Sequence, residues 1–96
     1  MSEFRFAVNV LPKPGILDPQ GRAVELSLPH LNVTNVSMVR VGRRVELTVT
    51  AASEAEARAV VDGLAKELLS NPLIEVYAFE LLEATSSVAS TGAAPR

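Results

Sequence analysis

Two kinds of hydrophobic spacing alternate along this chain, and their order limits the possible folds more than any other feature. A strand with one buried face repeats an apolar residue every two positions, whereas an amphipathic helix repeats it every three or four. Strand-like segments lie at residues 4–10, 36–41, 45–50 and 74–82. Helical spacing lies at residues 19–28 and 57–68. The predicted order of elements is therefore β-α-β-β-α-β.

Both predicted helices carry signals at their ends. Asp18 is a suitable N-cap for the first helix, and Pro19 fits the first helical position, where a missing N–H costs nothing. Pro29 predicts that this helix ends or bends there, because the proline ring clashes with the carbonyl four residues earlier. Ser53 and Glu56 form a capping box before the second helix, which is the most clearly marked element.

The two middle strands flank the sequence Gly-Arg-Arg at residues 42–44. This pattern predicts a tight hairpin with Gly42 at positive φ. Two right-handed crossovers would then lay both helices on one face of a four-stranded antiparallel sheet, a ferredoxin-like α+β sandwich. Residues 1–83 are expected to form this single domain, and the small polar residues 84–96 a flexible C-terminal tail.

Composition excludes several classes of function. The chain has 96 residues, 48% of them hydrophobic, a formal net charge of −2 and no cysteine. That charge gives no footprint for nucleic acid or an anionic membrane. Without cysteine there is no disulfide framework, thiolate nucleophile or zinc-thiolate site. No apolar run approaches the roughly 18 residues of a membrane span, and no signal peptide precedes the first strand. We expect a cytoplasmic protein.

Residues with catalytic chemistry are sparse. His30 is the one histidine, next to Pro29, and a solvated surface imidazole is the expected state. No phosphate-binding glycine motif and no serine in a strand-turn-helix elbow occur. Arg40, Arg43 and Arg44 could hold a carboxylate or phosphate, or could simply be solvated. We therefore predict no catalytic residue, no metal site and no cofactor bound by this chain.

The last strand is apolar on both faces. One face carries Ile74, Val76 and Ala78, and the other carries Tyr77, Phe79 and Leu81. In a lone domain one face of an outer strand should be wet, so apolar residues on both faces suggest that a neighbouring molecule covers one of them. We expect a homo-oligomer formed through the sheet, with Ile74, Val76 and Ala78 at the contact.

Three stretches together resemble one family. They are LDPQGRAV at residues 17–24, VRVGRRVEL at residues 39–47 and NPLIEVYAFEL at residues 71–81. In this order they are similar to the small PurS-type subunit of bacterial and archaeal phosphoribosylformylglycinamidine synthase, over about residues 4–82. Three departures lie at Pro29, at residues 32–36 and at Val76.

The resemblance implies a non-catalytic role in purine biosynthesis. In that family's complex a glutaminase subunit releases ammonia, and a large synthetase uses ATP, with magnesium expected beside it, to convert formylglycinamide ribonucleotide to formylglycinamidine ribonucleotide. The small subunit is implied to form dimers or larger assemblies, to bridge the other two subunits and to assist ammonia transfer. An alternative is a dimeric regulatory module of the same fold that binds a small metabolite.

The segment before the first helix is the predicted partner contact. Gly21 lacks a Cβ, so another backbone could approach the first helical turn, and prolines stiffen the preceding loop. An equally acceptable interpretation is a well-capped helix with an accidental glycine. The predicted subunit-contact residues are Leu17, Asp18, Pro19, Gly21, Arg40, Gly42 and Arg43.

Overall fold

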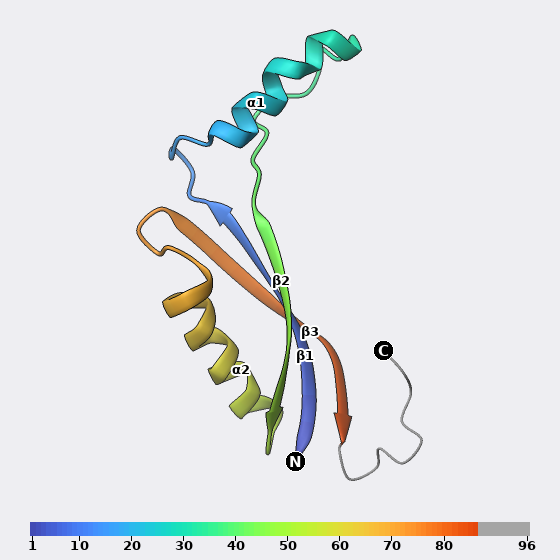
Figure 1. The fold of residues 1–96 in the computed structure, drawn as a ribbon, viewed down its shortest axis with the longest axis vertical. Helices are drawn as coiled ribbons and strands as arrows, with labels where there is room; N and C mark the ends of the chain where they lie inside the picture. The colour runs from blue at the N-terminus through green and yellow to red at the C-terminus, as the bar shows by residue number, and fades with distance from the viewer. Residues whose placement is uncertain (87–96) are drawn as a thin grey trace.

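The computed structural model describes residues 1–86 and contains three strands and two α-helices (Figure 1). In chain order they are β1 (Ser2–Pro12), α1 (Pro19–Ser27), β2 (Arg43–Ala51), α2 (Glu54–Leu64) and β3 (Glu75–Ser86). A 3₁₀ turn, Leu28–Leu31, follows α1, and a π-helical turn, Ala65–Leu69, follows α2. β3 extends three residues past the expected domain end, and the rest of the expected tail lies outside the described residues.

The sheet is antiparallel with the strand order β2-β1-β3. β1 lies in the centre, and its Phe6 stands opposite Leu47 of β2 and Leu81 of β3. The register between β1 and β3 shifts by one residue between Arg5 and Phe6. Because β1 lies between β2 and β3, its backbone groups are paired on both sides and its side chains are the most buried.

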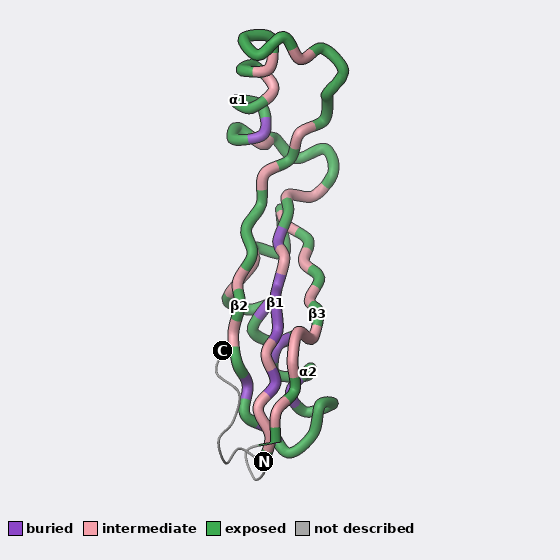
Figure 2. Tube along the Cα trace, turned by 90° about the vertical axis from the view of Figure 1, so that its right-hand side faces the viewer, coloured by how far each residue is buried: buried purple, intermediate pink, exposed green. Residues whose placement is uncertain are grey.

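The hydrophobic core lies between one face of β1 and α2. The alternating residues of β1 on that face, Phe4, Phe6, Val8 and Val10, are all buried (Figure 2). α2 contributes a row at helical spacing, Ala57, Val61 and Ala65. The rings of Phe6 and Phe79 meet edge to face with their centroids 5.9 Å apart. The alternation in the first strand and the stripe on the second helix are thus confirmed as core.

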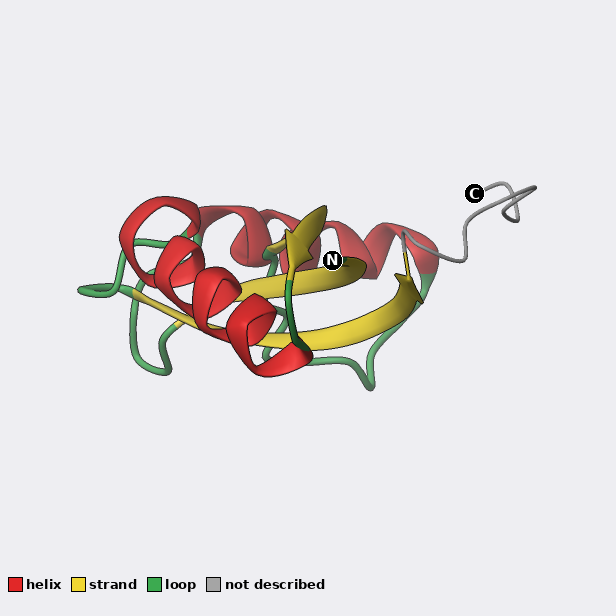
Figure 3. Cartoon of the chain, turned by 90° about the horizontal axis from the view of Figure 1, so that it is seen from below, coloured by secondary structure: helices red, strands yellow, loops and turns green. Residues whose placement is uncertain are grey.

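α2 crosses the strands at an angle, as the view along the long axis shows (Figure 3). Its start is fixed as predicted: the Ser53 hydroxyl oxygen accepts a hydrogen bond from the Glu56 N–H at 3.2 Å. The Glu56 carboxylate in turn accepts from the Ala52 N–H at 3.3 Å. Its far end is held to β3 by the Tyr77 hydroxyl, which donates to Asp62 at 2.7 Å.

The predicted hairpin and fourth strand are wrong. Residues 36–41 belong to no strand of the described sheet, and the chain passes from them into β2 without reversing (Figure 1). Gly42 does not adopt positive φ. It is a close-packing position: a Cβ there would stand 2.0 Å from the carbonyl oxygen of Val10. The sequence signal therefore marked a tight approach to β1 rather than a turn.

The predicted placement of both helices on one sheet face is also wrong. α2 covers the sheet, but α1 lies beyond its end (Figure 1). We call residues 13–42 the head, and the sheet with α2 and its π turn the body. The chain measures 54 × 31 × 16 Å with a radius of gyration of 18.0 Å, whereas a compact domain of this length would have about 12.5 Å. The separated head accounts for this elongation.

The predicted end of the first helix is confirmed. α1 stops at Ser27, and Pro29 lies in the following 3₁₀ turn. Asn32 then takes the left-handed conformation (φ 61°) and closes the turn, with its N–H donating to Pro29 O at 3.0 Å. From there the chain runs back along α1 toward the body (Figure 1), so both ends of the head meet at one neck.

Candidate functional site

A groove of about 590 Å³ lies at the neck between head and body. We call it the neck groove. Six residues that the sequence singled out line it: Leu17, Asp18, Pro19, Gly42, Arg43 and Ile74. Its other lining residues are Pro12, Ile16, Gln20, Val41 and Glu75. Three segments far apart in the sequence meet here, so residues predicted separately for a subunit contact and for a sheet contact share one surface.

Asp18 ties the neck groove together. One carboxylate oxygen accepts from the Gly21 N–H at 3.0 Å and caps α1, and the other accepts from the Val41 N–H at 2.9 Å. These hydrogen bonds, that from Gly21 first, lower the pKa of Asp18, and the Arg40 guanidinium adds a smaller effect in the same direction. Asp18 is thus a structural clasp between α1 and the returning chain, and its oxygens are occupied.

A second carboxylate repeats this arrangement about two turns further along α1. The Glu25 side chain accepts from the Val39 N–H at 2.8 Å, and its other oxygen lies 3.2 Å from the Arg22 guanidinium. The N–H groups of Val39 and Val41 therefore both point at α1. Because alternate residues of an extended chain point to opposite sides, the backbone of Arg40 points away from it.

Gly21 is buried, and the backbone that approaches it is that of Val39 in the same chain. A Cβ at Gly21 would stand 2.2 Å from the Val39 carbonyl oxygen. The close approach that the sequence predicted therefore occurs within the head. The absence of a Cβ at Gly21 lets residues 39–41 lie against α1. Because Gly21 is buried, it offers little surface to a partner.

Arg43 lines the neck groove and is held there by the start of β3. Its guanidinium donates to both carboxylate oxygens of Glu75 at 2.9 Å, and also to Leu69 O at 2.7 Å. The hydrogen bond from the Arg43 guanidinium, followed by that from the Asn71 N–H, lowers the pKa of Glu75. The hydrogen bond to Glu75 in turn raises the pKa of Arg43. Arg43 therefore joins β2 to the start of β3 and to the end of the π-helical turn that follows α2.

Arg40 lies in an adjoining groove of about 450 Å³ on the other side of residues 16–18. Its lining includes Lys13, Ile16, Leu17 and Met38. Arg40 and Met38 are exposed, Met38 at 84%. Leu17 borders both grooves and is 81% exposed. A leucine so exposed between two concave surfaces is the feature of the head most suited to burial by another protein.

The predicted sheet contact is dispersed along β3. Ile74 and Val76 are 42% and 43% exposed, and Ala78 is exposed as well. Ile74 belongs to the neck groove, whereas Val76 and Ala78 lie further along the strand. These residues continue the exposed apolar surface from the neck onto the open face of the sheet.

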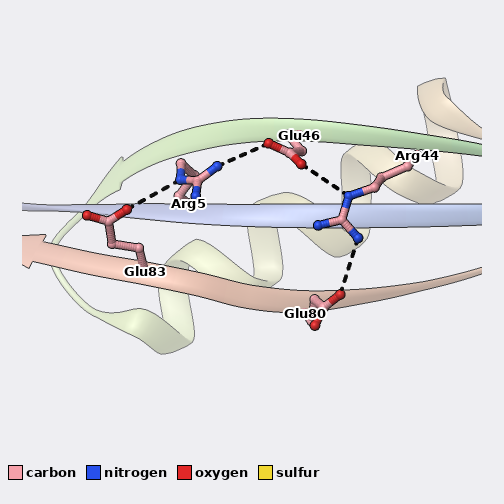
Figure 4. A network of polar contacts seen from close by, with 5 residues as sticks. All are labelled: Arg5, Arg44, Glu46, Glu80 and Glu83. Carbon is pink, nitrogen blue, oxygen red and sulfur yellow. Dashed lines mark hydrogen bonds and ion pairs between the residues drawn. The ribbon is translucent and has the colours of Figure 1, made fainter. Parts of the chain in front are cut away.

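Sequence reasoning missed a network of charges on that open face (Figure 4). Arg5 lies 3.0 Å from Glu46 and 3.4 Å from Glu83, while Arg44 lies 3.1 Å from Glu46 and 3.5 Å from Glu80. The alternation of each strand did place these residues on one face, but their pairing depends on a cross-strand register that the sequence does not encode. The open face is therefore charged in its middle and apolar toward the neck.

The described residues offer little catalytic chemistry. His30 is exposed, as expected. Within residues 1–86 no group of three or more His, Asp or Glu side chains is placed to hold a metal ion. None of the helices in this part of the chain is long and apolar enough to cross a membrane.

Comparison with known proteins identifies the family. Residues 5–83 match the model of the PurS family, described as phosphoribosylformylglycinamidine (FGAM) synthase. The PurS subunit of FGAM synthase from Synechocystis is 42% identical over 74 residues, 77% of this chain and 74% of that protein. The Bacillus subtilis subunit is 35% identical and covers 83% of this chain and 94% of its own length.

Solved structures agree with the sequence comparison. A chain in the PurLQS structure from Thermotoga maritima superposes with a TM-score of 0.78 at 32% identity, covering 85% of this chain and 100% of that one. The PurS structure from Bacillus subtilis superposes with a TM-score of 0.71 at 34% identity, covering 83% and 99%.

Proposed function

Because the chain belongs to the PurS family of FGAM synthase, we propose that it is the connector of that complex, bridging the glutaminase and synthetase subunits and assisting the passage of ammonia. The chain is a subunit of FGAM synthase and acts in purine biosynthesis. The PurLQS structure, in which a similar chain occurs, supports association with the other subunits. The connector is non-catalytic and works in the cytoplasm.

The observation that carries this proposal is the neck groove. Its charged groups are bonded within the chain, since Asp18 caps α1 and Arg43 is bonded to Glu75. The exposed apolar side chains that it offers to a partner are Leu17 at 81% exposure and Ile74 at 42%. An apolar patch rimmed by polar residues is typical of a protein interface. The groove therefore suits docking better than proton transfer.

The division of chemistry in this proposal is the one that the family resemblance implies. ATP and magnesium are bound by the synthetase subunit, and glutamine is hydrolysed by the glutaminase. Ammonia released into bulk water at neutral pH would be protonated to unreactive ammonium. A docking subunit can close the path between the two active sites without contributing a reacting group, and the neck groove is the surface by which this chain would do so.

Reconstitution tests the bridging role. The glutaminase and synthetase are assayed with and without this chain, once with glutamine and once with an ammonium salt. Omission of the chain should abolish glutamine-dependent turnover, while ammonium-dependent turnover survives much better. An equal loss with both nitrogen sources would contradict a role in ammonia transfer.

A pair of leucine variants tests the contact itself. Leu17→Asp should weaken binding to the other subunits by roughly tenfold or more, because a charge would be buried at the centre of the contact. Leu68→Asp is the matched control, since Leu68 is 73% exposed on the π-helical turn and does not line the groove. Equal binding by both variants would move the contact away from the neck.

A further inference from the structure

The groove of about 450 Å³ on the other side of residues 16–18 differs in charge from the neck groove. We call it the head groove. Its lining combines apolar side chains, among them Leu17 and Met38, with the basic side chains of Lys13, Arg22 and Arg40. Leu17 and Met38 are 81% and 84% exposed. Because a small-molecule site encloses most of its ligand, apolar side chains as exposed as these suit a segment of another protein better.

Met38 stands in this groove with an unusual backbone conformation. Its φ is 58°, in the left-handed region that residues other than glycine rarely adopt. Such a conformation persists only where neighbouring contacts fix it, and here the N–H of the next residue, Val39, is bound by Glu25. The head therefore presents an exposed methionine, a flexible side chain that adapts to the shape of a partner.

Arg40 is the one arginine of residues 1–86 that takes part in no ion pair. The other arginines in this part of the chain are each paired with a carboxylate: Arg5, Arg22, Arg43, Arg44 and Arg58. Lys13, which lines the same groove, has no ion pair within these residues either. Two cations without a carboxylate partner thus share the head groove.

The carboxylates of the head groove are already in use. Asp18 and Glu25 line it as well, but their oxygens accept hydrogen bonds from backbone N–H groups of the head, and Glu25 also pairs with Arg22. The donors of Lys13 and Arg40 therefore remain available to an acceptor on another molecule. A guanidinium matches the two oxygens of a carboxylate in particular.

We propose that the head groove binds an acidic segment of one of the two partner subunits. A carboxylate of that segment accepts hydrogen bonds from Arg40 and Lys13, and an apolar side chain of it packs against Leu17 and Met38. This inference rests on the proposed function, because it names the chemistry of a partner in that complex. The neck groove, whose charges are paired within the chain, takes a less charged surface, so charge decides which partner lies on which side of residues 16–18.

Two other occupants are less well matched in charge. Residues 87–96 of this chain contain no acidic residue. A second copy offers few available carboxylates, because most acidic side chains of the described body already bind a basic side chain or a hydroxyl group. These are Glu46, Glu54, Asp62, Glu75, Glu80 and Glu83.

Binding kinetics with each purified partner subunit test the proposal. Lys13→Glu and Arg40→Glu, made separately, should each lower the association rate with one subunit by roughly tenfold in about 0.1 M salt, because exposed charges mainly steer the encounter. The loss should shrink in about 1 M salt, where charges are screened over about 3 Å. Met38→Ala should instead raise the dissociation rate from the same subunit, as loss of a packed contact does.

Lys66→Glu is the matched control. It makes the same change of charge at an exposed position on the π-helical turn, and Lys66 lines neither groove. Its association rates with both subunits should stay at the wild-type values. Circular dichroism and sedimentation of each variant check that the fold and the self-association of the chain are retained.

Three results would overturn the proposal. Wild-type association rates for both groove variants would show that no acidic segment binds there. A change confined to self-association would place a second copy in the groove. A saturable shift of the Val39 amide by inorganic phosphate, lost in Arg40→Glu while partner binding is unchanged, would identify a site for a free anion.

Failure of this proposal and failure of the bridging role give different results. If both groove variants bind normally while omission of the chain still abolishes glutamine-dependent turnover, only the acidic segment is excluded. If omission of the chain leaves that turnover intact, the bridging role itself is wrong.

Discussion

The body and the head of this molecule are held together by different forces. Every buried apolar side chain of the described residues belongs to the body, and the one buried residue of the head is Gly21 (Figure 2). The head is instead closed by carboxylates that accept backbone N–H groups, Asp18 and Glu25. A helix of nine residues is marginal without a packed face. The body therefore has a hydrophobic core of its own, whereas the head depends on hydrogen bonds to two carboxylates.

The largest effect should come from emptying the centre of the body. Phe6 is fully buried between β1 and α2 and contacts Phe79. Phe6→Ala should lower the free energy of unfolding by about 3–5 kcal/mol, because it removes apolar contacts and leaves a cavity. Urea denaturation followed by circular dichroism measures this. A loss below about 1 kcal/mol would mean that the core does not carry the body.

The same contrast explains what the sequence could predict. The body followed from local patterns: the alternation of Phe4, Phe6 and Val8 and the capping box at Ser53 specify a strand and a helix whatever surrounds them. The position of the head did not follow from local patterns, because the capping signals of α1 specify a helix but not where that helix lies relative to the sheet. The sequence predicts a turn at Gly42, whereas the structure requires glycine there because a Cβ would clash with the Val10 carbonyl. Whether a glycine serves a turn or a close contact depends here on the backbone of Val10, which is distant in the sequence, so local spacing cannot predict it.

For the candidate site, sequence reasoning found residues but not their roles. Leu17, Gly42 and Ile74 were chosen from separate segments and do line one groove. The clasp between Asp18 and Val41 and the clamp between Arg43 and Glu75 were missed, because each joins residues more than 20 positions apart.

The next largest effect should come from a glycine-to-alanine substitution in the head, compared with the same substitution in the body. Gly21→Ala places a Cβ 2.2 Å from the Val39 carbonyl and should push residues 39–41 off α1. Hydrogen exchange of the Val39 and Val41 amides should accelerate by roughly tenfold or more, while the body keeps its protection. Two-dimensional NMR of the exchanging protein measures both regions at once.

Gly63→Ala is the control for that change. Gly63 lies within α2, and a Cβ there meets nothing within 4 Å. Alanine should therefore stabilise the body by about 0.5–1 kcal/mol, since glycine is costly inside a helix. If Gly21→Ala slowed hydrogen exchange in the head, as Gly63→Ala should slow it in the body, the close approach of Gly21 to Val39 would be absent in solution.

A smaller effect comes from pH and should be confined to the head. The hydrogen bonds to Asp18 lower its pKa from the usual 3.8, so the folded head favours the ionised carboxylate. Its contribution is fully present above pH 3.8 and is lost as the pH falls through the lowered pKa. NMR titration of the Val41 amide should show a midpoint below 3.8.

Asp18→Asn sharpens that titration. Asparagine is still a good N-cap, but it has one oxygen and no titrating proton in this range. The Val41 amide should lose its dependence on pH near the carboxylate range, while α1 keeps its start. A wild-type midpoint at or above 3.8 would show that the clasp to Val41 does not form.

The smallest effect is expected on the open face of the body. Arg5 pairs with Glu46 and Glu83 there, and its side chain is 35% exposed. Arg5→Gln should cost less than about 1 kcal/mol, and the difference from wild type should shrink further in 1 M salt, which screens exposed charges over about 3 Å. Urea denaturation at two salt concentrations measures this. A larger loss that salt leaves unchanged would mean that water is excluded from these charges, because a neighbouring molecule covers the open face.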